Sequence, residues 1–383
     1  MGLLLYFIME LLGAYGFILF IVLGLSTVIQ LYYYIFIFGK FAFYKPTVNP
    51  KNLSEEPVSI IIAARNEYAN LEKNLKAILE QDYPNYEVIV VNDCSWDDSQ
   101  KLLEYYQEVY SHLKICQLIE QEKYPTGKKF ALTMGIKATK NNKLLFTDAD
   151  CAPNSNQWLR LMQEQYTTGK EIILGFSPYK GFGSLLSMFI QYESGITAIA
   201  YFSAAIAKRP FMGVGRNLSY TKDLFFKNKG FASHQHILSG DDDLFVNETA
   251  TSTNVAIQIN PDSFVYTEAK KTFTSWSRQK TRHVSTGKFY KSNDKFFLGL
   301  YYSSLMLFYP AFGCLLLMQI QLPVCIGIFG MRFLTQLVIM YFALKKLKYA
   351  HILWLLPFLD VLYLFYIVIF GTRGLLTRKQ KYW

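Results

Sequence analysis

Three long stretches of this chain are almost free of charged residues, and they constrain the fold more than any other feature. Residues 11–39 and 296–331 contain no Asp, Glu, Lys or Arg, and residues 352–371 contain only Asp360. About 20 consecutive apolar residues are enough to cross the hydrocarbon core of a bilayer. The sequence therefore predicts an integral membrane protein with helical transmembrane segments at both ends and a polar middle. We expect an anchor at residues 1–43, a cytoplasmic domain at 44–295 and transmembrane or interfacial helices at 296–383.

The basic residues flank the apolar stretches. They include Lys40, Lys45, Lys280, Arg282, Lys288, Lys291, Lys295, Lys345, Lys346 and Lys348. Such a distribution is typical of the cytoplasmic side of a membrane protein, so we expect the polar domain on the cytoplasmic face of the cell (inner) membrane. The net charge of +10 could also suggest nucleic acid as a partner. No basic stripe with stacking aromatics and no nucleic-acid motif supports that alternative.

The C-terminal apolar region predicts a helical hairpin followed by an ambiguous segment. Residues 296–319 and 322–344 can form two helices that turn near Gln321, while 352–371 are long enough for one crossing. That crossing would place Arg373, Arg378, Lys379 and Lys381 on the outer side, against the positive-inside rule. Either the rule is broken or the segment lies in the interface or re-enters. Arg332 and Asp360 are costly in lipid, so they can pair with each other or line a path for an acceptor.

The polar middle alternates short apolar runs with helical patterns. The runs of strand length lie at residues 58–64, 86–91, 113–118 and 144–147. After the first run, Leu71, Leu75 and Ile78 recur with the spacing of a helix face. This alternation predicts an α/β fold with a doubly wound, mostly parallel sheet.

Polar residues follow the predicted strands where each one ends. Residues 65–67 follow the first strand, Asn92 and Asp93 the second, and Asp148 and Asp150 the last. In open α/β sheets ligands bind at that edge. Alternation along a strand would put the Asp148 and Asp150 side chains on one face, about 6–7 Å apart. Neither a phosphate loop nor a dinucleotide fingerprint is present, which disfavours an NTPase or a dehydrogenase.

A second acidic cluster occurs at Asp241, Asp242 and Asp243. Adjacent carboxylates repel one another, so ionisation of one raises the pKa of the next unless a cation compensates. Upstream, His234 and His236 have a spacing that a metal site could use, but no third ligand is near, so we interpret them as polar loop residues.

Four motifs together resemble the family 2 glycosyltransferases with a GT-A-type fold. The first motif is residues 57–62 with Arg65-Asn66-Glu67, and the second is residues 90–95. The third is Gly127-Lys128 with Ala131-Leu132, and the fourth is Asp148-Ala149-Asp150. The resemblance covers nearly all of the polar middle. It implies a nucleotide-sugar donor whose base and ribose are held by the backbone near Ala64 with Glu67 and Asp93.

The same resemblance implies roles for the remaining charged motifs. Lys128 would lie near the donor diphosphate, and Asp150 would ligate Mg²⁺ or Mn²⁺ with Asp148 close by, as in the family's Asp-x-Asp motif. Asp242 would be the general base that deprotonates the acceptor hydroxyl, with Asp241 as the second choice. Residues 212–220 resemble the family's glycine-containing segment under the acceptor site, although a turn into a strand explains them equally well.

Residues 276–283 resemble the Gln-x-x-Arg-Trp signature of membrane-embedded members of the family. Gln279 and Arg282 match and would engage the donor diphosphate, whereas His283 stands where the signature has Trp. Trp276 or His283 could take over the stacking role at the acceptor. A basic amphipathic helix at the membrane surface explains the same residues, and both interpretations can hold.

We therefore expect a membrane-bound, inverting, metal-dependent glycosyltransferase of the hexosyltransferase type. It would transfer a sugar from a UDP- or GDP-sugar to a lipid, lipid-linked or glycan acceptor, as in polysaccharide biosynthesis. Two alternatives remain open. One is a processive polysaccharide synthase of the cellulose, chitin or hyaluronan synthase type, and the other is a non-catalytic membrane transporter or receptor with a glycosyltransferase-like domain.

Overall fold

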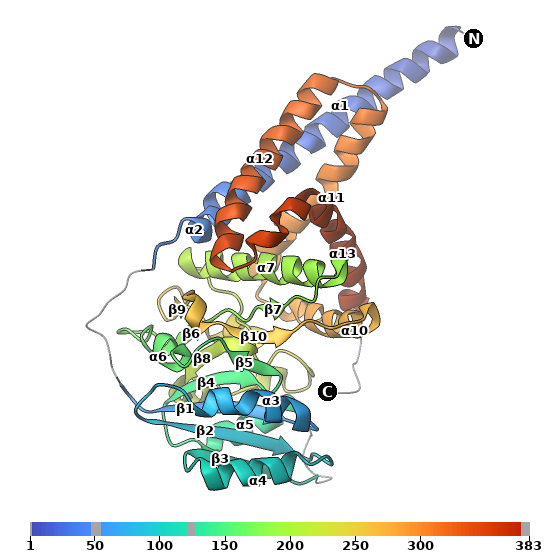
Figure 1. The fold of residues 1–383 in the computed structure, drawn as a ribbon. Helices are drawn as coiled ribbons and strands as arrows, with labels where there is room; N and C mark the ends of the chain where they lie inside the picture. The colour runs from blue at the N-terminus through green and yellow to red at the C-terminus, as the bar shows by residue number, and fades with distance from the viewer. Residues whose placement is uncertain (1, 47–54, 121–126, 377–383) are drawn as a thin grey trace.

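The apolar helices and the polar domain form two connected parts of one structure (Figure 1). The computed structural model describes residues 2–46, 55–120 and 127–376. Within them, four helical stretches are long and apolar enough to cross a membrane: 13–42, 292–317, 322–346 and 350–374. Of the basic residues at the C-terminal end, Arg378, Lys379 and Lys381 lie outside the described residues.

Three of these stretches run side by side away from the sheet (Figure 1). The first is α1 (Gly2–Tyr32), which continues through a π-helical turn (Tyr33–Phe38) into α2 (Gly39–Ala42). The others are α11 (Ser292–Leu317) and α12 (Leu322–Lys346), joined by a turn in which Gln321 has a φ of 47°. The predicted hairpin is confirmed.

The fourth stretch behaves differently. After a 3₁₀ segment (Ala350–Leu355), α13 (Leu356–Leu376) packs against α10 (Phe273–Val284) and α7 (Leu185–Ile206) beside the sheet domain (Figure 1). The sequence left the path of this segment open because hydropathy is the same for a helix in lipid and a helix on an apolar protein surface.

A mostly parallel sheet forms the centre of the polar domain, as predicted. Its strand order is β3-β2-β1-β4-β8-β6-β9. The strands are β1 (Val58–Ala64), β2 (Tyr86–Asp93), β3 (Leu113–Leu118), β4 (Lys143–Asp148), β6 (Ile172–Leu174), β8 (Leu218–Thr221) and β9 (Val255–Ile257). β1 pairs in parallel with β2 and β4, whereas β8 is antiparallel to β4 and β6.

Helices cover both faces of this sheet because β1 is apolar on both faces. Ile60 and Ile62 pack in a cluster with residues of α3 (Tyr68–Leu79) and α4 (Ser99–Val109). Ile61 belongs to the opposite cluster, with residues of α5 (Lys128–Ala138). Gly135 lets α5 approach closely, because a Cβ there would lie 2.8 Å from Val91 and 2.9 Å from Ile61.

The remaining elements extend the domain toward the apolar helices. A small sheet of order β5-β10-β7 lies between the main sheet and α7 (Figure 1). Its strands are β5 (Cys151–Pro153), β7 (Tyr179–Lys180) and β10 (Val265–Glu268), and the shorter helices are α6 (Trp158–Gln163), α8 (Lys222–Lys227) and α9 (Asp243–Thr249).

A buried ion pair connects α12 to α13. The Arg332 guanidinium lies 2.9 Å from the Asp360 carboxylate, and the two residues are 0% and 2% exposed. Arg332 also donates to Gln30 of α1, and Tyr192 of α7 donates to Asp360. Of the two expected alternatives, the pairing of Arg332 with Asp360 is confirmed, and it holds α13 against the other apolar helices.

Candidate active site

One cavity of about 1230 Å³ lies between the sheet domain and the apolar helices. The carboxyl ends of β1 and β4 form one end, and α7, α11 and α13 contribute the other. Most of the residues singled out in the sequence line it: Glu67, Lys128, Asp148, Asp150, Asp241, Asp242, Gln279, Arg282 and His283. Segments more than 200 residues apart therefore meet in a single chamber.

Asp148 and Asp150 form the candidate metal end of the cavity. β4 ends at Asp148, and Asp150 lies in the turn before β5, so the expectation that both lie on one face of a strand was wrong. The turn brings ligand atoms of Asp148, Asp150 and Cys151 within 4.8 Å of one another. Carboxylate oxygens suit a hard cation such as Mg²⁺ or Mn²⁺. Burial raises the pKa of the Cys151 thiol, which donates to Asp150 at 3.1 Å and so orients that carboxylate.

Lys128 connects this end to the second acidic cluster. Its ammonium lies 2.9 Å from Asp148 and 3.0 Å from Asp241, so one side chain spans the gap between the two carboxylates. Burial alone would lower the pKa of Lys128, but Asp148, Asp241 and Asp242 together raise it above its usual value. Lys128 is therefore a fixed cation at the centre of the acidic groups.

The three neighbouring aspartates have different partners. Asp241 pairs with Lys128, whereas Asp243 accepts hydrogen bonds from the Thr286 and Tyr290 hydroxyls. Asp242 accepts from two backbone N–H groups, Gly215 at 2.7 Å and Asp243 at 2.7 Å. Asp242 is thus held in place by backbone and its carboxylate has no side-chain cation directly bonded to it among the described residues.

These different environments give Asp241 and Asp242 different pKa values. Burial, together with the charges of Asp241 and Asp243, raises the pKa of Asp242 to about 7. Burial would also raise the pKa of Asp241, but the Lys128 ammonium outweighs it and lowers that pKa. A carboxylate whose pKa lies near the working pH is suited to act as a general base.

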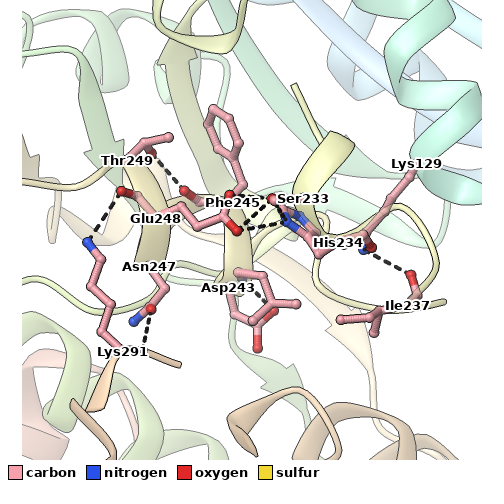
Figure 2. A network of polar contacts seen from close by, with 11 residues as sticks. Lys129, Ser233, His234, Ile237, Asp243, Phe245, Asn247, Glu248, Thr249 and Lys291 are labelled. Atoms are coloured by element: carbon pink, nitrogen blue, oxygen red, sulfur yellow. Dashed lines mark hydrogen bonds and ion pairs between the residues drawn. The ribbon is translucent and has the colours of Figure 1, made fainter. Parts of the chain in front are cut away.

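A network of polar contacts fixes the loop that precedes these aspartates (Figure 2). The buried Lys129 ammonium donates to the backbone carbonyls of His234 at 2.7 Å and Ile237 at 2.9 Å. The His234 ring contacts Ser233 and Glu248, so His234 is a buried loop anchor and not an exposed polar residue. Burial lowers the pKa of Lys129 to about 8.

The ends of β1 and β2 form a further polar corner. The loops after these strands are tied together, because the Asn66 N–H donates to Ser95 and the Trp96 N–H donates to the Asn66 side chain. Asp93 is buried, and its Oδ2 has no hydrogen-bond partner among the described residues. Ala64 and Asp93 do not line the cavity itself, while Glu67 does.

Helix α10 presents its polar face to the cavity. Gln279 Oε1 and Arg282 Nε are buried without a hydrogen-bond partner among the described residues. Desolvation inside the cavity, together with the charges of Lys280 and Arg282, lowers the pKa of His283 below its ordinary value. Trp276 is 2% exposed, packs against Phe189 and Phe370, and is absent from the described cavity lining.

Sequence reasoning missed several residues of the cavity. A buried Lys280–Glu193 ion pair, to which the Tyr366 hydroxyl also donates, ties α10 to α7 and α13. Arg216, which lines the cavity, lies in the segment 212–220. A charged residue among glycines and apolar residues there could have indicated a functional side chain. The aromatic residues of the cavity lining could not be predicted from the sequence, because they belong to apolar segments. They are Tyr302, Tyr363, Tyr366 and Phe370.

The sheet, its two covering layers and the acidic groups at its carboxyl edge define a GT-A-like α/β domain. Residues 59–214 match the family model described as Glycosyl transferase family 2. The resemblance to this family that the sequence predicted is confirmed over these residues.

Two curated relatives are similar over part of their length. Glycosyltransferase AglE of Haloferax volcanii is 30% identical over 193 residues, which is 48% of this chain and 58% of AglE. Probable glycosyltransferase YdaM of Bacillus subtilis is 26% identical over 281 residues, which is 69% of this chain and 64% of YdaM. The chain thus spans about three fifths of the length of each relative.

One solved structure shares the fold over nearly the whole chain. The mannosyltransferase PcManGT from Pyrobaculum calidifontis, in complex with GDP-Man and Mn²⁺, has a TM-score of 0.61 and 16% identity. The match covers 95% of this chain and 99% of PcManGT. The likeness therefore includes the apolar helices as well as the sheet domain.

Proposed function

We propose that this protein is an inverting glycosyltransferase of the hexosyltransferase type that depends on Mg²⁺ or Mn²⁺. It transfers a sugar from a UDP- or GDP-sugar to a hydroxyl of a lipid, lipid-linked or glycan acceptor. Residues 44–295 would form the catalytic domain on the cytoplasmic face of the cell membrane, with an anchor at 1–43 and membrane or interfacial helices at 296–383. The observation that carries the proposal is the Lys128 bridge, because it brings the candidate metal carboxylates and Asp242 into one cavity.

In this proposal, different residues bind the nucleoside and the diphosphate of the donor. Asp93, whose Oδ2 has no hydrogen-bond partner among the described residues, and Glu67 suit the hydroxyls of a ribose and the N–H groups of a base. Gln279 and Arg282, whose buried polar atoms lack partners, would face the diphosphate together with Lys128. Asp150, with Asp148, would hold the cation, which neutralises charge on the departing diphosphate.

Asp242 would accept the proton of the attacking hydroxyl. The acceptor oxygen forms a bond to the anomeric carbon as the bond from that carbon to the diphosphate oxygen breaks, and the electron pair leaves with the nucleoside diphosphate. The Gly215 and Asp243 N–H groups fix the Asp242 oxygens, so the base is positioned before the acceptor arrives. PcManGT, which shares the fold, was solved with GDP-Man and Mn²⁺, which supports a donor and cation of these classes.

A donor panel tests the proposal. Purified full-length protein is incubated with UDP- and GDP-sugars, Mn²⁺ and membrane lipid extract, and release of nucleoside diphosphate and labelled product is measured. We expect turnover with at least one donor and its loss in Asp150→Ala, while Asp262→Ala, at an exposed aspartate outside the cavity, retains activity. Absence of turnover with every donor would favour the non-catalytic alternative, and long products would favour a processive synthase.

A further inference from the structure

Arg216 extends from a short buried turn that its neighbours hold rigidly. The turn Gly215–Asn217 precedes β8, and the Gly215 N–H donates to Asp242. The Asn217 side chain donates to the carbonyls of Phe176 and Ser263, both at 2.8 Å. The backbone on each side of Arg216 is therefore fixed by hydrogen bonds.

The Arg216 side chain is oriented by an aromatic ring. Its guanidinium carbon lies 4.4 Å from the ring centroid of Tyr179, which is 3% exposed. At that distance the stacking attracts the cation and leaves the edge of the planar guanidinium, with its N–H donors, available to a ligand. Arg216 and Tyr179 both line the cavity.

Arg216 differs from the two lysines of the cavity that have carboxylate partners. Lys128 bridges Asp148 and Asp241, and Lys280 pairs with Glu193. Within the described part of the chain, the Arg216 guanidinium makes no hydrogen bond or ion pair. Nearby carboxylates stabilise the charge of Arg216. Because none of them is bonded to it directly, the N–H donors of the guanidinium stay available to an anionic ligand.

The electrostatic surroundings place Arg216 between the two ends of the reaction site. Burial disfavours the charge of Arg216, but the Tyr179, Cys151 and Asp150 groups raise its pKa above the usual value. Arg216 in turn is one of the cations that lower the pKa of His283 on α10. The guanidinium is thus within electrostatic reach of both the candidate metal end and α10.

We propose that Arg216 is a phosphate-binding residue, positioned by Tyr179 to accept a phosphate group of a substrate. The planar fork of an arginine matches two phosphate oxygens at once, which a lysine cannot do. The proposal rests on the proposed function for its choice of substrate. The phosphate could belong to the donor diphosphate or to a lipid acceptor that carries a phosphate, and the experiment separates these sources.

The test measures binding and not turnover. Full-length protein in detergent is titrated calorimetrically with inorganic pyrophosphate plus Mn²⁺ and, separately, with farnesyl phosphate and its uncharged match farnesol. In Arg216→Met we expect about tenfold weaker binding of one phosphate probe, as loss of a charge-assisted contact predicts, with an intermediate effect in Arg216→Lys. Arg209→Met is the matched control, because Arg209 is exposed and stacks on Phe297 away from the cavity lining.

Each outcome decides the question. Weaker pyrophosphate binding assigns the donor diphosphate to Arg216, and weaker farnesyl phosphate binding with unchanged farnesol assigns a phosphate of the acceptor. Unchanged binding of both phosphate probes in both Arg216 variants overturns the proposal, as does failure of the wild-type protein to bind either probe. These titrations measure binding and do not depend on sugar transfer. If the proposed function is wrong, the donor panel shows no turnover, while the binding curves are unchanged.

Discussion

Asp241, Asp242 and Asp243 carry the same side chain but differ in what their oxygens contact. The Lys128 ammonium holds Asp241 ionised, and hydroxyl groups hold Asp243. Asp242 faces neighbouring negative charge and is fixed by backbone N–H groups. The environment of each carboxylate, and not its residue type, therefore favours Asp242 as the group that exchanges a proton.

The pKa of about 7 for Asp242 predicts a pH profile. A base must be deprotonated to act, so the rate of transfer should rise with pH through about 7 and then level off. Since the folded-state pKa is raised, the unfolded chain loses this proton at lower pH, and Asp242 should lower the stability of the fold as pH increases from about 4 to about 7. Initial rates and thermal midpoints measured between pH 5 and pH 9 check both signs.

Asp242→Asn removes the proposed base and keeps the size of the side chain. Loss of general base catalysis should lower kcat by about 10²- to 10⁴-fold, with little change in nucleoside diphosphate binding. Asp262→Asn serves as the control, because Asp262 is exposed and outside the cavity lining. An Asp242→Asn enzyme with wild-type kcat would show that another group accepts the proton.

At the scale of elements, α5 positions two loops through adjacent lysines. Lys128 bridges the acidic groups in the cavity, while Lys129 is held by carbonyls of the loop before Gly240 (Figure 2). Gly240 itself has a φ of +94°, and a Cβ there would collide with Leu244. The turn into the three aspartates thus depends on both a glycine and a buried ammonium.

Lys129→Met should loosen this loop. Two buried carbonyls would lose their donor, which predicts a loss of about 1–3 kcal/mol in unfolding free energy and a lower kcat. Lys137→Met is the matched control, since Lys137 lies on the exposed face of the same helix. Equal thermal midpoints and rates for the two variants would contradict a positioning role for Lys129.

Elements with a strong local signal were predicted well. β1 and β3 lie where the apolar runs predicted them, and α3 lies where the helical spacing of Leu71, Leu75 and Ile78 predicted it. Each of these elements buries residues that its own sequence defines. The position of Asp150 was wrong, since strand alternation cannot reveal that β4 ends at Asp148. A turn is decided by a few backbone dihedral angles, and those depend on the partner strand β10, which pairs with β5 more than 100 residues further along the chain.

On the scale of the whole molecule, the apolar helices and the sheet domain share the walls of one cavity. α7, α10 and α13 meet at the Lys280–Glu193 pair and the Tyr366 hydroxyl. Further from the sheet, Arg332 and Asp360 join α12 to α13. The sequence analysis identified Lys280 as basic and Arg332 and Asp360 as costly in lipid, but it missed Glu193. Only the tertiary packing determines that α13 reaches the cavity.

Breaking the Arg332–Asp360 pair should destabilise the assembly of helices. Arg332→Met leaves a buried carboxylate without its cation, which costs about 3–5 kcal/mol. Arg332→Met combined with Asp360→Leu removes both charges and should recover much of that loss. Thermal unfolding in detergent of the two single variants and the double variant measures this coupling, and strictly additive losses would contradict it.

The wall that α13 contributes has a consequence for how the protein can be produced and purified. Residues 356–376 leave the ribosome after the sheet, α7 and α10, so a nascent chain with a finished α/β domain still lacks one side of the cavity. Trimming the hydrophobic C-terminal helices to obtain a water-soluble fragment would therefore open the chamber to solvent. A preparation with an intact cavity must therefore keep these helices in detergent or lipid.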